Sequence, residues 1–233
     1  MKKSSLGMVV LGSLGLVAAC GSSSSSSSPP VTTPAACVDP TGPGCKIPVA
    51  DGSFVKWTGP VRDVAMGGAS SAVVTYTPGK LCLSGTVDAG ANNAGWGAIL
   101  IAGLADIDPT GKLVAPFNAS SLGVTQLRFN LESPPPQGVV AALTQLTSAD
   151  CTQVPSCVTS FSLGGAVTNP GSFTAKLTDF AQPDSTSSNT SLDPTLITTL
   201  QLYVAALPGM MVPYDFCIDD LTFLGADGRE IKP

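Results

Sequence analysis

The sequence predicts an all-β protein, an antiparallel two-sheet jelly-roll sandwich. Short runs of β-branched and aromatic residues recur along the chain, and turns rich in Gly, Pro, Asn and Asp separate them. No segment shows helical periodicity beyond a turn or two. Charged residues make up only 12% of the chain, which also contains 25 glycines and 20 prolines. Many short strands with frequent turns are therefore expected.

The expected strands follow one another, and each ends at a turn signal. They are a mixed segment from Ile47 to Trp57, then Ser71 to Thr77, Lys80 to Val87, Trp96 to Ile101, Val124 to Glu132, Val139 to Leu146, Ser172 to Leu177, Leu200 to Val204 and Tyr214 to Phe223. The clearest alternation is in Val124 to Glu132, which ends before three prolines. Val139 to Leu146 fits strand or helix by periodicity, and its neighbours favour a strand.

The last expected strand changes parity once along its length. Phe216 and Ile218 share one parity, whereas Leu221 and Phe223 share the other. Alternate side chains of a strand point to opposite faces, so an extra residue is needed to keep all four on one face. The sequence therefore predicts a β-bulge at Asp219-Asp220.

The first 19 residues predict a secretory signal peptide. A basic start precedes an apolar run, Leu6 to Ala19, which is too short to span a membrane comfortably. Leu16 to Cys20 resembles the lipobox of bacterial lipoproteins, which implies that Cys20 is lipidated and begins the mature chain. Gly21, rather than Asp, in the second position of the mature chain resembles lipoproteins that are exported to the outer membrane. The protein is then expected on the periplasmic or the external side of that membrane. An ordinary cleaved signal is the alternative.

Residues 20–36 are expected to form a flexible tether, because Ser, Pro, Thr and Ala leave almost no apolar surface to bury. Residues 37–233 then form a single jelly-roll β-sandwich domain, which is long enough for one core.

Without the two signal lysines the chain has 9 basic and 16 acidic residues, a net charge of -7. No basic cluster exists, so nucleic acid is not an expected partner, and the lipid is the expected contact with the membrane. The oligomeric state is not predicted.

Six cysteines are left once Cys20 is lipidated. An even number in an exported chain predicts three disulfides, for which fifteen pairings exist. The favoured pairings are Cys37–Cys45, Cys151–Cys157 and Cys82–Cys217. The first two would each close a short loop, and the third would link distant strands. A zinc site is disfavoured because the chain has no histidine.

The order and spacing of four segments resemble those of a known protein family. They are Leu81-Cys-Leu-Ser-Gly-Thr-Val87, Trp96-Gly-Ala-Ile-Leu100, Phe173 to Gln182 with its Thr178-Asp-Phe180 core, and Asp193-Pro-Thr195 leading through Leu200-Gln-Leu-Tyr203 to Asp215-Phe-Cys-Ile-Asp-Asp-Leu-Thr-Phe223. Together they resemble the jelly-roll carbohydrate-binding modules of the galactose-binding-like superfamily, especially the family-eleven β-glucan-binding modules and the related complex I intermediate-associated family. The resemblance implies sugar binding, although other members of the superfamily bind proteins or have no known ligand.

A sugar-binding face needs a flat aromatic ring and fixed polar groups. Arg128 and Asn130 on one strand, with Gln201 and Tyr203 on another, supply this mixture at outward positions. We predict that the four share one concave sheet face; an ordinary solvated sheet face is the alternative. Trp96 is a fifth candidate, although its apolar neighbours favour packing in the core.

The bulge also predicts a structural calcium site. Asp219 and Asp220 offer carboxylates where a bulge frees backbone carbonyls, and Asp51 is a third candidate ligand. The resemblance supports this, since jelly-roll binding modules often hold calcium near the terminal strand. The alternative is that the two adjacent carboxylates cap a strand end or hydrogen-bond a loop. No other cofactor is expected.

Catalysis is not expected. A chain without histidine has no Ser-His-Asp triad, its only glutamates are Glu132 and Glu230, and no spacing of aspartates marks a catalytic pair. The predicted function is an exported, lipid-anchored, non-catalytic binding protein for a poly- or oligosaccharide. One alternative is a structural or protein-interaction lipoprotein whose jelly roll has no sugar ligand. The second is an aspartate-dependent glycoside hydrolase.

Overall fold

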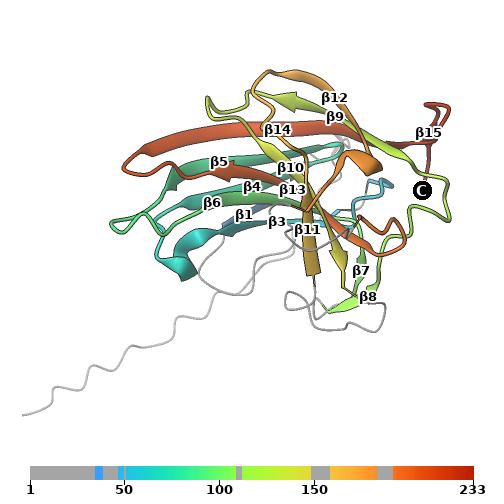
Figure 1. Ribbon diagram of the computed structural model, residues 1–233, viewed down its shortest axis with the longest axis horizontal. Coiled ribbons are helices and arrows are strands. Elements are labelled where there is room, and N and C mark those ends of the chain that lie inside the picture. The colour runs from blue at the N-terminus through green and yellow to red at the C-terminus, as the bar shows by residue number, and fades with distance from the viewer. Residues whose placement is uncertain (1–34, 39–46, 50, 109–111, 148–157, 183–190) are drawn as a thin grey trace, which may run out of the picture. The chain divides into compact units, whose positions relative to one another are not determined.

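The computed structural model describes residues 35–38, 47–49, 51–108, 112–147, 158–182 and 191–233 (Figure 1). The predicted signal peptide, Cys20 and most of the tether lie outside these residues. Strand pairing begins at Ala35, two residues before the expected start of the domain.

Two antiparallel sheets make up nearly all of the described structure. Sheet A has the strand order β1 (Ala35–Val38), β4 (Ser71–Thr77), β5 (Lys80–Asp88), β14 (Met211–Leu224), β9 (Gln126–Glu132) and β12 (Gly171–Lys176), with β15 (Glu230–Ile231) paired to β14. Sheet B has the order β11 (Val158–Ser162), β10 (Val140–Leu146), β13 (Ile197–Ala205), β6 (Gly97–Gly103), β3 (Trp57–Arg62) and β2 (Ile47–Pro48). The predicted antiparallel two-sheet jelly-roll sandwich is confirmed.

The remaining elements are short. They are a two-stranded ribbon of β7 (Asp106–Ile107) and β8 (Leu113–Ala115), and the 3-10 helices η1 (Asp63–Met66) and η2 (Leu177–Asp179). Within the described part of the chain, no helix is long and apolar enough to cross a membrane.

Alternation along the strands places one apolar layer between the two sheets. Leu127, Phe129 and Leu131 of β9 are buried, and so are the inward residues of β13, namely Leu200, Leu202 and Val204. These residues of sheet A and sheet B belong to one hydrophobic cluster. Three rings, Phe54, Phe117 and Phe223, pack against one another in it with centroids 5.0–5.3 Å apart. The predicted β9 alternation and the strand assignment of 140–146 are confirmed.

Strand β14 is the long central strand of sheet A and lies between β5 and β9 (Figure 1). Its first part pairs with β5 and its last part with β9, and the β9 register shifts between Asp219 and Thr222. Asp220 adopts a positive φ of 50° at this shift. Phe216, Ile218 and Phe223 are all buried despite their different parity. The predicted bulge is therefore confirmed, and it keeps the strand's apolar side chains in the core.

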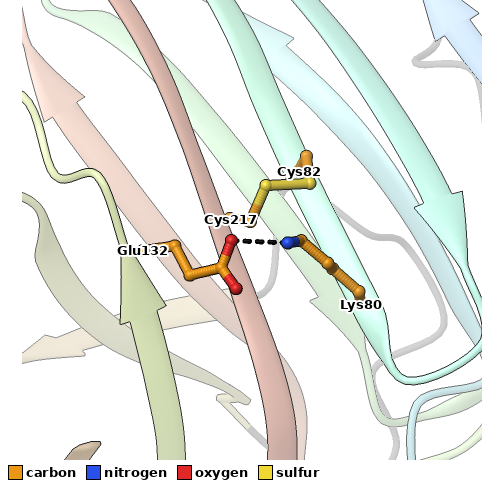
Figure 2. The surroundings of a disulfide bond; sticks show 4 residues. All are labelled: Lys80, Cys82, Glu132 and Cys217. Carbon is orange, nitrogen blue, oxygen red and sulfur yellow. Dashed lines mark hydrogen bonds and ion pairs between the residues drawn. A yellow bond between two sulfur atoms is a disulfide. The ribbon is translucent and has the colours of Figure 1, made fainter. Parts of the chain in front are cut away.

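The disulfide between Cys82 and Cys217 joins directly opposite residues of β5 and β14 (Figure 2). Their Cα atoms are 4.0 Å apart, and both side chains are only partly buried, on the outer face of sheet A. This predicted pairing is confirmed. Cys45, Cys151 and Cys157 lie outside the described residues, and the side chain of Cys37 is not described, so the other two pairings stay predictions.

A buried carboxylate ties together the loops at one end of the sandwich. Asp63, fully buried after β3, accepts hydrogen bonds from the Ser70 backbone N–H (3.2 Å), the Ser70 hydroxyl (3.0 Å) and the Gly97 N–H (2.7 Å). Ser70 precedes β4 of sheet A, whereas Gly97 begins β6 of sheet B. Gly68 and Gly95 leave room for the carboxylate, because a Cβ on either would lie within 2.5 Å of it. Asp63 thus connects both sheets.

Replacing Asp63 with Asn tests this connection. Both carboxylate oxygens accept hydrogen bonds, but an amide has one acceptor and would turn an NH₂ group toward N–H or O–H donors. We expect the free energy of unfolding to fall by about 2–4 kcal/mol, because a buried donor loses its acceptor. Urea unfolding measures this, with the exposed Asp106→Asn as control. Equal stability of the two variants would show that Asp63 does not hold the loops.

Candidate functional site

The predicted sugar-binding residues are divided between the two sheets. Arg128 and Asn130 lie on β9 of sheet A, whereas Gln201 and Tyr203 lie on β13 of sheet B. All four alternate with buried residues and so point away from the core, as predicted. The outer faces of two packed sheets look in opposite directions. The prediction of one shared face is therefore wrong, because alternation within a strand does not reveal which sheet the strand joins.

On sheet B the aromatic side chains pack on the sheet itself. The Tyr203 and Trp96 rings lie with their centroids 5.9 Å apart, and the Tyr203 hydroxyl donates to the Trp96 carbonyl. Burial is the main cause that raises the pKa of the Tyr203 hydroxyl, and the negative charge of the nearby Asp63 carboxylate raises it further. Trp57 lies across Gly103, where a Cβ would come 2.1 Å from its ring. These contacts use the aromatic rings and the Tyr203 hydroxyl for packing within sheet B.

Trp96 occupies a different environment from the expected one. It is half-buried just before β6 and does not belong to the hydrophobic cluster of the described residues. The prediction of core packing is therefore wrong. Apolar neighbours in the sequence indicated the core, but the residue precedes the strand, where alternation does not yet fix its face.

On sheet A, Arg128 and Asn130 line an open hollow of about 340 Å³, here called the polar hollow. Its walls are Arg128 and Asn130 of β9, Ser172 of β12, Asp220 and Thr222 of β14, and Glu230 of β15. Asn130 donates from Nδ2 to Asp220 Oδ2 at 3.2 Å. The bulge creates this arrangement, because it turns Asp220 out of the regular β14 pairing and leaves Thr222 opposite Arg128.

The polar hollow offers hydrogen-bonding groups of every kind. The Arg128 guanidinium only donates, the carboxylates of Asp220 and Glu230 only accept, and the Asn130 amide does both. The Thr222 hydroxyl oxygen is buried and has no hydrogen-bond partner among the described residues. A buried polar atom of this kind is costly unless water or a ligand satisfies it. The hollow therefore suits a small ligand rich in donors and acceptors.

Three of these wall residues were not predicted from the sequence. Thr222 follows the bulge, and its outward position could have been found from the parity change. Ser172 is an ordinary small residue at the start of a strand. Glu230 reaches the hollow only because β15 folds back on β14 after a turn at residues 225–228, a pairing that two residues of strand do not reveal.

An ion pair lies beside the polar hollow, next to the disulfide (Figure 2). Lys80 of β5 and Glu132 of β9 meet across β14 with their charged atoms 2.5 Å apart. The hydrogen bond from Lys80 lowers the pKa of Glu132, and the same bond raises the pKa of Lys80. A glycosidase acid needs a raised pKa. The Glu132 shift has the opposite direction, which disfavours Glu132 as that acid.

The three predicted calcium ligands do not converge. Asp51 and Asp220 line a second cavity, described below, while Asp219 lies beside Lys80 and lines neither cavity. The Asp51 carboxylate accepts the N–H groups of Ser53 and Gly79 at 3.0 and 3.1 Å. Among the described residues, no three acidic or cysteine side chains form a group that could hold a metal. Calcium takes six to eight oxygen ligands, which this set does not fit.

Chelation tests the remaining calcium prediction. Because the predicted carboxylates are dispersed, we expect EDTA to leave the melting temperature unchanged, since only an ion bound to the native state raises it. Thermal unfolding followed by circular dichroism, with and without EDTA, measures the effect. A fall of several degrees that calcium chloride reverses, and that Asp51→Asn abolishes, would restore the predicted ion.

Comparison with known proteins gives structural likenesses only. No family model matches the chain, and no curated protein matches it. One similar solved structure is the Family 11 Carbohydrate-Binding Module of cellulosomal cellulase Lic26A-Cel5E of Clostridium thermocellum, at 12% identity over 83% of this chain and 95% of that chain, with a TM-score of 0.43. Another is the solution structure of CtCBM11, at 12% identity over 84% and 98%, with a TM-score of 0.41. By structure, this chain is similar to family 11 carbohydrate-binding modules.

Proposed function

We propose that the chain is an exported, lipid-anchored, non-catalytic protein that binds carbohydrate in the polar hollow of sheet A. The observation that carries this proposal is the convergence of six polar side chains from four strands, Thr222 among them, on one open hollow. A sugar presents hydroxyl groups that each donate and accept, so it can satisfy a guanidinium, carboxylates and an amide together.

The charges of the hollow favour a sugar over an anionic polymer. Asp220 and Glu230 oppose one cation, Arg128, so a phosphate or sulfate would meet two carboxylates for each guanidinium. Nucleic-acid binding instead depends on clustered cations that neutralise phosphates. No aromatic residue lines the hollow. Binding therefore rests on hydrogen bonds, and the expected affinity is modest.

The absence of catalysis is part of the proposal. Glu132, one of the two glutamates in the sequence, is paired with Lys80, which lowers its pKa. Glu230 is exposed at the rim of the hollow. An aspartate-dependent hydrolase would release sugar from a bound polysaccharide. A structural or protein-interaction lipoprotein would bind no glycan.

Arg128→Ala tests the proposed hollow. Binding of residues 21–233 to plant, bacterial and host polysaccharides is screened first, by glycan array and affinity electrophoresis. For a glycan that binds, we expect Arg128→Ala to weaken binding at least about ten-fold, because a hydrogen bond to a charged group contributes about 1.5–3 kcal/mol. Gln201→Ala is the matched control, since it removes an outward polar side chain from sheet B.

Three other results would overturn the assignment. A chain that binds no glycan supports the protein-interaction alternative. Loss of binding in Gln201→Ala, with Arg128→Ala unchanged, would move the site to sheet B. Release of reducing sugar from the same polysaccharides would identify a hydrolase.

Lipid anchoring at Cys20 is supported by the resemblance of Leu16 to Cys20 to a lipobox. We expect Cys20→Ser to move the protein from the membrane pellet to the soluble fraction and to abolish labelling by radioactive palmitate, with Ser23→Ala as control. Retention of Cys20→Ser in the outer membrane would contradict the anchor. Trypsin accessibility on intact cells would then separate a periplasmic from an external position of the anchored protein.

A further inference from the structure

A second cavity of about 450 Å³, here called the apolar cavity, opens beside the bulge of β14. Its walls come from the segment before β3, from the β4–β5 turn, from the bulge and from the C-terminal residues. The apolar residues that face it include Phe54, Val55, Leu81, Ile218, Leu221 and Ile231. This volume is within the range of small-molecule sites, which are mostly apolar with a few polar groups.

The inner wall of the apolar cavity is fixed by the core. Phe54 is buried and packs edge-on against Phe117 and Phe223, with centroids 5.3 and 5.0 Å away. Leu81 and Ile218 are buried neighbours on paired strands. A preformed wall loses little conformational entropy when a ligand enters, so apolar burial there is converted efficiently into affinity.

The apolar cavity and the polar hollow share a wall. Asp220, Thr222 and Glu230 line both of them. The bulge explains this, because the parity change turns Leu221 toward the apolar cavity while Thr222 stays opposite Arg128. A ligand of two parts, one polar and one apolar, can therefore lie across the bulge and occupy both.

We propose that the apolar cavity takes an alkyl, acyl or aryl substituent carried by the sugar in the polar hollow. This inference rests on the proposed carbohydrate binding and narrows its ligand to sugars that bear a short apolar group. A free fatty acid fits less well. Its carboxylate would meet three carboxylates at the cavity, those of Asp51, Asp220 and Glu230. Of the two lysines among the lining residues, Lys80 is already paired with Glu132, which leaves Lys232 alone against the three.

Matched glycosides test the two-part ligand. The probes are methyl and hexyl glycosides of glucose, galactose and mannose, below the concentrations at which they form micelles, titrated into residues 21–233 by calorimetry. Each buried methylene adds about 0.8 kcal/mol at most, or roughly a four-fold gain in affinity. Since five methylenes separate the probes, we expect the hexyl glycoside of the preferred sugar to bind at least ten-fold more tightly than the methyl glycoside.

Two variants assign this gain to the apolar cavity. Leu221→Gln should remove most of the hexyl advantage and leave the methyl glycoside unchanged, and Ile231→Gln gives a second test should the first variant fold poorly. Arg128→Ala should weaken both glycosides by the same factor, because it lines only the polar hollow.

Each contrary result has a distinct meaning. Equal affinity for methyl and hexyl glycosides overturns this inference and leaves sugar binding intact. Hexyl glycosides that bind Arg128→Ala as tightly as the unchanged chain show an apolar site independent of the polar hollow, which overturns the two-part ligand. Failure of every glycoside, with no polysaccharide bound either, overturns both this inference and the proposed function.

Discussion

Strand β14 must keep one face on the core for 14 residues while it pairs with β5, β9 and β15. A single slip in its alternation would push every later apolar side chain into solvent. The bulge at Asp219-Asp220 resolves this constraint, because one extra residue returns Phe223 to the layer that holds Phe216 and Ile218. Three of the seven strands of sheet A depend on that correction, since β9, β12 and β15 are all placed through the second half of β14.

The same bulge gives this end of the molecule its two kinds of surface. A regular strand would present Asp220 and Thr222 to one face and Leu221 to the other at even spacing. The bulge instead breaks the pairing with β9, and polar and apolar side chains then diverge around a short stretch of backbone. Bulges often lie next to functional sites for this reason: they aim side chains that a flat sheet would hold in rows.

Features that depend on local alternation could be predicted from the sequence. The β9 faces, the bulge and the outward positions of Arg128 and Asn130 all follow from period two. The pairing of Cys82 with Cys217 was also predicted, and it now proves to lie within one sheet. Sheet membership could not be predicted, because β13 is placed by its partners β6 and β10, which are distant in the sequence. Gln201 and Tyr203 therefore lie on the wrong side of the molecule for the face we expected.

The contacts of Asp63 at the other end of the sandwich also could not be predicted from the sequence. Gly68 and Gly95 read as ordinary turn residues, yet each leaves space for the carboxylate of Asp63. The hydrogen bond from the Gly97 N–H to Asp63 joins residues that are 34 positions apart, so no local sequence pattern predicts it. Loops that connect two sheets need such ties, because their backbone N–H groups lie outside the strand ladders and still require acceptors.

The position of the disulfide has a mechanical consequence. The chain enters sheet A through β1, and the polar hollow lies beyond β14. Force between the proposed anchor at Cys20 and a ligand in the hollow would therefore cross the sheet from β4 to β5 to β14. At the β5–β14 boundary the Cys82–Cys217 bond holds the strands covalently. Tension across sheet A would meet a covalent link at this boundary, in addition to the hydrogen bonds between the strands. Under the proposed anchoring, this bond would keep β5 and β14 paired while a bound glycan is pulled away from the membrane.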